Sequence, residues 1–250
     1  MVLFGDSASG KSYFAMWIAG VLTEQGIRVL YADWELSKRE HKKRLHRLFQ
    51  PAPKLLYAHC DDSLKHEAQR LQELLVEHKC EYLICDSIGF AVDGAAETHE
   101  AASAYFRALR QLKIGSLNIA HIPKQGDDGK EAQIFGSNFF RHGARSVWYI
   151  ERAKENPKGE IRFGLYQRKN NLGETSKPLA YRLEFRGDRS RIEQIQVENV
   201  DELAAALPLL DRMKRTLQDG AMTAKALSEE LSAPIVSIRS VLNRHASHFV

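Results

Sequence analysis

Gly5-Asp6-Ser7-Ala8-Ser9-Gly10-Lys11-Ser12 is the stretch that decides the fold of this chain. It matches G-x-x-x-x-G-K-[ST], the pattern of a phosphate-binding loop. The apolar residues Met1 to Phe4 come directly before it and predict a buried strand, and an apolar pattern with helical spacing follows at once. A strand before the loop and a helix after it are the context in which this pattern binds phosphate.

Each part of the loop has a physical role. Gly5 and Gly10 allow the tight turn that presents backbone N–H groups to phosphate oxygens. The helix that begins near Lys11 points the positive end of its dipole at the same oxygens. We expect the Lys11 ammonium to bind the β- and γ-phosphates and the Ser12 hydroxyl to ligate Mg²⁺. The sequence therefore predicts ATP and Mg²⁺ as cofactors, with the nucleotide held by Gly5, Asp6, Ser7, Ala8, Ser9, Gly10, Lys11, Ser12 and Tyr13.

Composition indicates an ordinary globular protein. The 250 residues are 44% hydrophobic and 27% charged, enough for one large α/β domain with a small appendage. The net charge of +4 permits a polyanionic partner without requiring one. The three cysteines form no C-x-x-C and predict buried thiols in a reducing compartment. Since no apolar run approaches the length of a membrane span and no leader opens the chain, we expect a cytoplasmic protein without membrane contact.

Helical and strand patterns alternate over the first half of the chain. Helices are expected over 11–25, 37–49, 62–78 and 98–113, and strands over 27–33, 55–57, 82–87 and 116–122. A polar, Gly-rich loop is expected at 123–130 and a short helix over 135–143. Strands then follow one another at 145–151, 161–168, 179–185 and 192–197. This order predicts an α/β fold whose mostly parallel sheet ends in antiparallel strands.

The pattern becomes entirely helical after Val200. Helices are expected over 207–217, 223–231 and 234–245, the last two separated by a tight turn. This spacing favours a small helix-turn-helix or winged-helix-like module. We therefore divide the chain into 1–199, the domain with the phosphate loop, and 200–250, the helical module. The module contains six basic residues (Lys and Arg together) and six acidic residues (Asp and Glu together), so its net charge is zero. Its charge therefore does not decide whether it contacts DNA or protein.

Three polar residues at predicted strand ends are the other candidates for chemistry. Asp86 would hold Mg²⁺ beside Ser12. Glu35 is the candidate general base that orients the attacking water, with Asp33 as its nearest competitor and helix capping as the alternative role for Glu35. His121 could sense the γ-phosphate or simply close the end of the sheet. Because the carboxyl ends of parallel strands share one edge, these groups could converge on the phosphate loop.

The order of these elements along the chain resembles that of the RecA-like ATPases: the loop at 5–12, then Glu35, Asp86 and His121. In detail it resembles the RepA-type plasmid replicative helicases and their relatives among phage and mobile-element proteins. The resemblance extends to three further segments and covers roughly residues 1–185. These segments are Glu35 to Arg44-Leu-His-Arg-Leu48, Gly136-Ser137 to Ala144-Arg145-Ser-Val-Trp148, and Arg168-Lys169-Asn170-Asn171-Leu172-Gly173. The family usually carries two histidines where this chain has Ala120-His121.

The resemblance implies a ring, usually a hexamer, with ATP between subunits. A neighbouring protomer would then supply Arg145 as an arginine finger, and Lys169 as a further contact to the γ-phosphate, while Arg141 is the alternative finger. It also implies single-stranded DNA as the partner. Lys124 and Lys130 in the polar loop, and the basic helix at 37–49, would serve that role, although exposed basic helices are often only solvated.

Three functions compete at this point. The first is an ATP-driven nucleic-acid motor, most like a replicative helicase. The second is an ATP-dependent regulatory or DNA-binding switch that does not unwind DNA. A small-molecule phosphotransferase is the third, and it would need a closing lid with several arginines, of which the sequence shows no sign.

Overall fold

We describe the protein from a computed structural model. The structure describes residues 1–122, 134, 139–197, 209–246 and 249. It divides into two compact units, Met1–Ile195 and Gln196–Val250, which are described separately. The predicted boundary at 199/200 and the predicted loop at 123–130 lie outside the described residues, as do Lys124 and Lys130.

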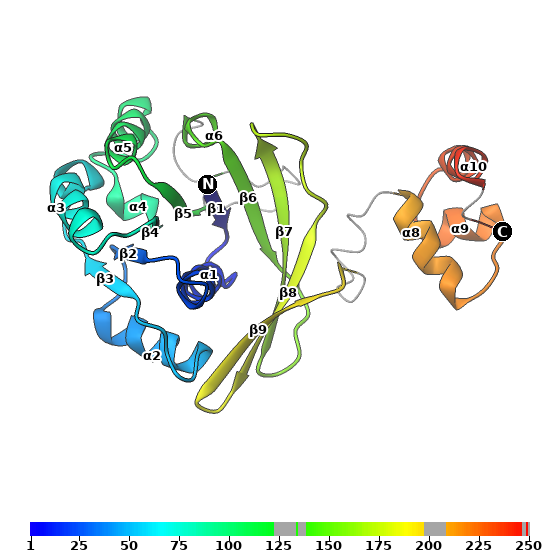
Figure 1. Cartoon of the computed structure of the whole chain (residues 1–250). Coiled ribbons are helices and arrows are strands. Elements are labelled where there is room, and N and C mark those ends of the chain that lie inside the picture. Colours follow the sequence, from blue (N-terminus) through cyan, green and yellow to red (C-terminus); the bar gives the residue numbers. More distant parts are fainter. Residues whose placement is uncertain (123–133, 135–138, 198–208, 247–248, 250) are drawn as a thin grey trace. The chain divides into compact units, whose positions relative to one another are not determined.

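The described part of the first unit is built on one nine-stranded sheet with the order β3-β2-β4-β5-β1-β6-β7-β8-β9 (Figure 1). Its first strands are β1 (Val2–Gly5), β2 (Val29–Asp33), β3 (Leu56–His59), β4 (Tyr82–Asp86), β5 (Gly115–His121) and β6 (Ser146–Arg152). These six pair in parallel, and β1 lies between β5 and β6. The last three strands, β7 (Glu160–Asn170), β8 (Leu179–Arg186) and β9 (Arg189–Ile195), pair antiparallel.

Helices cover both faces of the parallel part of the sheet (Figure 1). One face carries α1 (Lys11–Glu24) and α2 (Lys38–Leu48), which pack against each other. The other carries α3 (Leu64–Glu77), α5 (His99–Gln111) and α6 (Phe139–Gly143), and the short α4 (Ile88–Ala91) follows β4. This layering buries the apolar strands on both faces, as a parallel sheet requires.

The main core lies between α1 and the sheet. It includes Phe14, Met16, Ile84, Ile119 and Phe163, all nearly inaccessible to solvent. Strands from the parallel and antiparallel parts contribute to this one cluster, so β1, β2 and β4 to β9 share a single hydrophobic core.

The close approach of α1 and α2 depends on a glycine in the middle of α1. A Cβ built on Gly20 would lie 2.1 Å from the ring of Phe49, the residue that ends α2. The aromatic ring therefore fills the space that any other side chain at position 20 would need.

The predicted α/β architecture is confirmed, including the change from parallel to antiparallel strands at β6 and β7. The predicted helices and strands of this unit are found with ends that differ by a few residues. Helix α4 lies between the strand predicted at 82–87 and the helix predicted at 98–113, where we predicted no helix. It has four residues, too few for a periodic pattern to show. The first part of the short helix expected over 135–143 lies outside the described residues, and α6 accounts for the rest.

The second unit contains α8 (Leu209–Thr216), the 3₁₀ turn η2 (Leu217–Asp219), α9 (Ala224–Glu230) and α10 (Ile235–Arg244). Met213, Leu227, Leu231 and Ile238 form its small buried core. Thr223 caps α9 through a bond from the Ala226 N–H, and a short turn joins α9 to α10 as expected. Residues 209–246 contain no strand, so the winged-helix variant of the prediction is not confirmed.

Candidate functional site

The carboxyl ends of β1, β2, β4 and β5 meet at one edge of the sheet. In the strand register Asp33 lies opposite Asp86, and Gly5 lies opposite His121. Glu35 follows Asp33 by two residues, and the phosphate loop follows Gly5. Parallel pairing therefore brings residues from four separate segments of the chain to one site, as expected for this class of sheet.

The phosphate loop is shaped by its two glycines. A Cβ at Gly5 would lie 2.3 Å from the backbone oxygen of Ile150 on β6, a distance that no side chain can tolerate. Gly10 has φ of 91°, in the left-handed region that favours glycine, and the next residue begins α1. Both glycines are thus required by the path of the backbone.

Lys11 is folded into this loop. Its Nζ donates to the carbonyl oxygens of Gly5 at 2.9 Å and Asp6 at 2.6 Å, and its side chain is almost completely buried. Burial lowers the pKa of Lys11 to about 8, although the negative charges of Asp86 and Glu35 oppose this shift. The loop therefore holds the Lys11 ammonium away from most of the solvent, where it can exchange the carbonyl oxygens for stronger hydrogen-bond acceptors.

Asp86 ends β4 and is buried beneath the loop. Its Oδ2 accepts a hydrogen bond of 2.7 Å from the Tyr31 hydroxyl, whereas Oδ1 is buried without a hydrogen-bond partner among the described residues. Burial raises the pKa of Asp86, and the nearby hydroxyls of Tyr31 and Ser12 work against that rise. A buried carboxylate oxygen left open beside the Ser12 hydroxyl fits a hard divalent cation, which would favour the ionised form.

Glu35 is held at the sheet edge by two side chains. Its Oε1 accepts hydrogen bonds from the hydroxyl of Ser87 and, at 2.9 Å, from Nε2 of His121. The bond with His121 is the main cause of a lowered pKa for Glu35; burial opposes it, and Ser87 adds to it. The carboxylate is 23% exposed, so it is ionised, oriented and still reachable by water.

Asp33, the competing candidate base, is engaged elsewhere. It is fully buried, its Oδ2 lies 2.8 Å from Nε2 of His41, and its carboxylate accepts the backbone N–H groups of Glu35 and Leu36. Burial alone would raise its pKa, but His41, the Glu35 N–H and the Tyr57 hydroxyl together hold the pKa below its usual value. Asp33 thus fixes the turn that carries Glu35. Capping of α2 falls to Ser37, whose hydroxyl accepts the Glu40 N–H, and not to Glu35.

Three further residues at the site were missed by sequence reasoning. Ser87 orients Glu35, Tyr31 orients Asp86, and Arg152 at the end of β6 donates to the backbone oxygen of Ala8 at 3.4 Å. Arg152 is exposed beside the phosphate loop. In the sequence, only Ser87 carries a signal of a role, because it directly follows Asp86. Tyr31 and Arg152 reach the site because of the order of the strands in the sheet.

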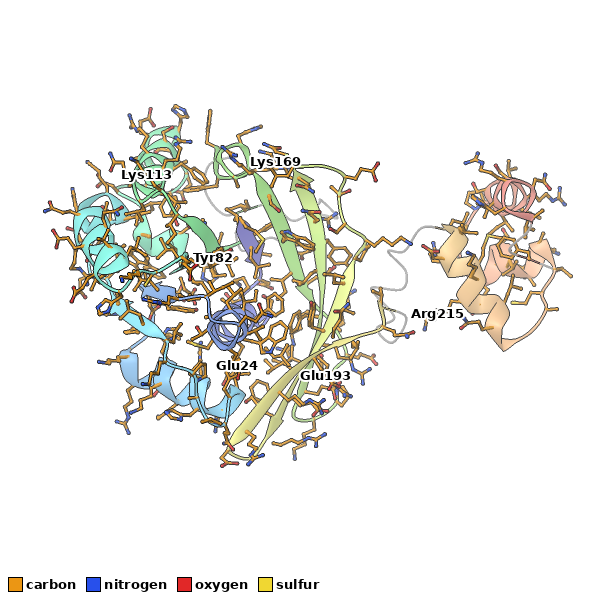
Figure 2. The ribbon with its side chains drawn as sticks, in the orientation of Figure 1. Glu24, Tyr82, Lys113, Lys169, Glu193 and Arg215 are labelled. Carbon is orange, nitrogen blue, oxygen red and sulfur yellow. The ribbon has the colours of Figure 1, made fainter. Side chains whose placement is uncertain are left out.

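The residues expected to act on a neighbouring protomer lie at the opposite end of β6. Arg145 and Arg141 are exposed, and Arg145 forms no ion pair within the described part of the chain. Lys169 lies near the end of β7 (Figure 2). Its ammonium donates to the carbonyl oxygens of Arg141, His142 and Ala144 at 3.0, 3.0 and 2.7 Å. Lys169 thereby stabilises the end of α6 and the segment that leads to Arg145.

Solved structures with similar folds include a replicative helicase and an ATPase domain. A DnaB-like replicative helicase, solved in a study of its interactions with primase, superposes with a TM-score of 0.61 at 13% identity, covering 78% of this chain and 58% of the other. A second solved structure, an isolated ATPase domain, gives a TM-score of 0.58 at 13% identity over 72% and 79% of the two chains. The chain has the RecA-like fold. A KaiC-like protein from Pyrococcus horikoshii also superposes on this RecA-like chain, with a TM-score of 0.56 at 15% identity, covering 77% and 88%.

Sequence relatives of the RecA-like chain are DNA repair proteins. It is 29% identical over 155 residues to the RadA protein of Campylobacter jejuni, and 25% identical over 154 residues to that of Chlamydia muridarum. Each match covers 60% of this chain and about a third of the relative, 33% and 32% respectively. The chain therefore spans about a third of the length of the curated relatives it matches. No protein-family model matches the sequence.

The described residues contain no group of three or more His, Cys, Asp and Glu side chains arranged to hold a metal ion. A cation at Asp86 and Ser12 would accordingly take its remaining ligands from the nucleotide and water. Among the helices that the structure describes, none is both long and apolar enough to cross a membrane.

Proposed function

We propose that the protein is an ATP-hydrolysing nucleic-acid motor of the RecA-like class, most like a replicative DNA helicase that acts on single-stranded DNA. The observation that carries the proposal is the Glu35 carboxylate, held by Ser87 and His121 at the sheet edge that also carries Lys11 and Asp86. A loop that only binds nucleotide needs no such carboxylate, whereas hydrolysis needs a group that orients the attacking water.

In this mechanism the loop amides and the Lys11 ammonium bind the β- and γ-phosphates of ATP. Lys11 leaves the carbonyl oxygens of Gly5 and Asp6 and gains phosphate oxygens in exchange. Glu35, already oriented by His121, accepts a hydrogen bond from the attacking water and aligns it with the γ-phosphate. It takes a proton from the water as the bond to the γ-phosphorus forms, while the bond from that phosphorus to the β–γ bridging oxygen breaks and ADP leaves. Asp86 and Ser12 would hold Mg²⁺, which neutralises charge on the phosphates.

Hydrolysis would be completed by a second protomer. We propose a ring, with a hexamer as the expected form, in which Arg145 of a neighbour stabilises the charge that develops on the γ-phosphate. Its exposure and its freedom from ion pairs among the described residues support this role. Lys169 would contact the same phosphate only after releasing three carbonyl oxygens; in its present contacts it supports the segment that carries Arg145.

The test is steady-state ATP turnover over a dilution series of the protein, with and without single-stranded DNA. Lys11→Ala serves as the blank. We expect turnover per protomer to fall on dilution, because the Arg145 finger comes from a neighbour, and to rise several-fold with DNA. Glu35→Gln should retain ATP binding and lose turnover by about 100-fold or more, since a general base contributes on that scale.

The results separate the proposal from its alternative. Turnover that responds neither to dilution nor to DNA would refute the ring motor. ATP-dependent DNA binding without unwinding of a forked duplex would instead support the regulatory switch. Normal cleavage by Glu35→Gln would show that the base is another group.

A further inference from the structure

Helix α2 packs against β9, the second strand of the hairpin formed by β8 and β9 (Figure 1). A basic groove lies between this helix and the hairpin. Two adjoining hollows of about 760 and 350 Å³ form it, and Arg47 and Gln50 line both. We call this feature the basic groove. Helix α2 supplies five cations to its walls and the hairpin supplies three: Arg39, Lys42, Lys43, Arg44 and Arg47, and Arg186, Arg189 and Arg191.

The charge of the groove is large for this protein. Against eight cations its walls carry only the acids Glu40, Glu184 and Asp188, an excess of five positive charges. The whole chain has a net charge of +4, so the groove alone accounts for its basic character. Concave surfaces of one charge sign concentrate electrostatic potential and attract ligands of the opposite sign.

Much of this charge is not neutralised by the protein itself. Arg39, Lys42 and Arg47 form no ion pair with any residue that the structure describes. The paired cations are Lys43 with Glu40, Arg186 with Glu184 and Arg191 with Glu193, each at 2.9 Å. Like charges packed together on one helix repel, and they are retained most readily where a ligand neutralises them. This distinguishes the groove from an exposed helix face on which basic and acidic residues alternate.

The geometry of the cations favours a linear ligand. Arg39, Lys43 and Arg47 recur every fourth residue along α2, so each lies about 6 Å further along the helix axis than the one before. A single strand with a charged, repeating backbone matches such a row, and a compact phosphate ligand would use only part of it. The smaller hollow continues the row toward the arginines of the hairpin.

The groove also begins beside the nucleotide site. Tyr13, the residue after Ser12, lines the larger hollow, and the Arg44 guanidinium lies over its ring at 4.9 Å from the centroid. Tyr13 also packs edge-on against Phe185 of β8. The first turn of α1 therefore contacts the phosphate loop at one end and both walls of the groove at the other.

We propose that the basic groove binds the phosphate backbone of single-stranded DNA independently of base sequence. The proposal deepens the proposed function and rests on it for the choice of nucleic acid over another polyanion. It places one DNA-binding surface on the face of the sheet that carries α1 and α2, using arginines of the hairpin that the basic pattern of α2 alone did not reveal.

The experiment compares two double variants with equal loss of charge. Lys42→Gln with Arg47→Gln removes two groove cations, whereas Arg107→Gln with Arg110→Gln removes two exposed cations from α5 on the other face of the sheet. Binding of a fluorescent oligothymidylate is measured by anisotropy without nucleotide, over a series of salt concentrations. Each lost phosphate contact should reduce the slope of log K against log salt by about 0.7.

We expect the slope to fall by about 1.4 for the groove variant and to stay unchanged for the α5 variant. Equal slopes in the two variants would overturn the groove proposal. Competition by polyglutamate as strong as by unlabelled oligothymidylate would also overturn it, in favour of an acidic protein partner. Basal ATP turnover, measured in parallel without DNA, should be unaffected in both variants. If the groove test fails but DNA still stimulates ATP turnover, the groove proposal is wrong and the proposed motor function is retained, with DNA bound at another surface.

Discussion

Nucleotide binding should be coupled to uptake of a proton by Lys11. Burial holds the pKa of this lysine at about 8 while its ammonium contacts backbone carbonyl oxygens. Phosphate oxygens carry full negative charge and would raise that pKa back to its ordinary value of 10.5 or above. About half of the free protein is therefore unprotonated at Lys11 at pH 8, and each such molecule must take up a proton when the nucleotide binds.

The magnitude follows from the pKa. Uptake should be about 0.1 proton per site at pH 7, about 0.5 at pH 8 and about 0.9 at pH 9. The assay is titration calorimetry with Mg-ADP, which has no γ-phosphate to lose, in two buffers of very different ionisation enthalpy. The difference between the two observed enthalpies, divided by the difference in buffer enthalpy, gives the number of protons. Equal enthalpies in both buffers at pH 8 would refute the reasoning.

A second measurement tests the same charge without any ligand. The unfolded chain keeps Lys11 protonated up to its ordinary pKa of 10.5, so between pH 8 and pH 10.5 the unfolded state binds more protons than the folded state. Stability should therefore rise with pH in that window, and the buried ammonium should cost about 3 kcal/mol below it. Lys11→Met should raise the melting temperature at pH 7 and remove the pH dependence between 8 and 10. A variant that melts at a lower temperature than wild type would contradict this account.

Two further predictions concern the base and the core. His121→Ala removes the main cause of the lowered pKa of Glu35, so burial should then dominate and raise that pKa. The acid limb of the pH profile of turnover should therefore move to higher pH in the variant than in wild type, and an unchanged profile would exclude the coupling. Gly20→Ala forces a methyl group against the ring of Phe49 and should destabilise the fold by about 1–3 kcal/mol in urea denaturation. Gly89→Ala, where the added methyl meets open space, is the matched control and should change little.

Local patterns in the sequence were sufficient for most of the fold. The loop at 5–12, the helix after it and the alternation of strands and helices predicted a parallel sheet, because each depends on contacts between residues near one another in the chain. The convergence of Glu35, Asp86 and His121 on the loop was also predictable, since parallel strands present their carboxyl ends at one edge. Strand order was not, because pairing joins segments far apart in sequence.

What the sequence by itself determined is therefore a phosphate loop, its neighbouring acids and the class of sheet that brings them together. Only the tertiary structure decided what holds each of the two candidate acids: His41 and two backbone N–H groups contact Asp33, while Ser87 and His121 orient Glu35. Likewise, only the packing of the β8–β9 hairpin beside α2 turned a basic helix into a groove. In both cases the deciding contacts join distant segments, and burial in the folded protein sets their strength.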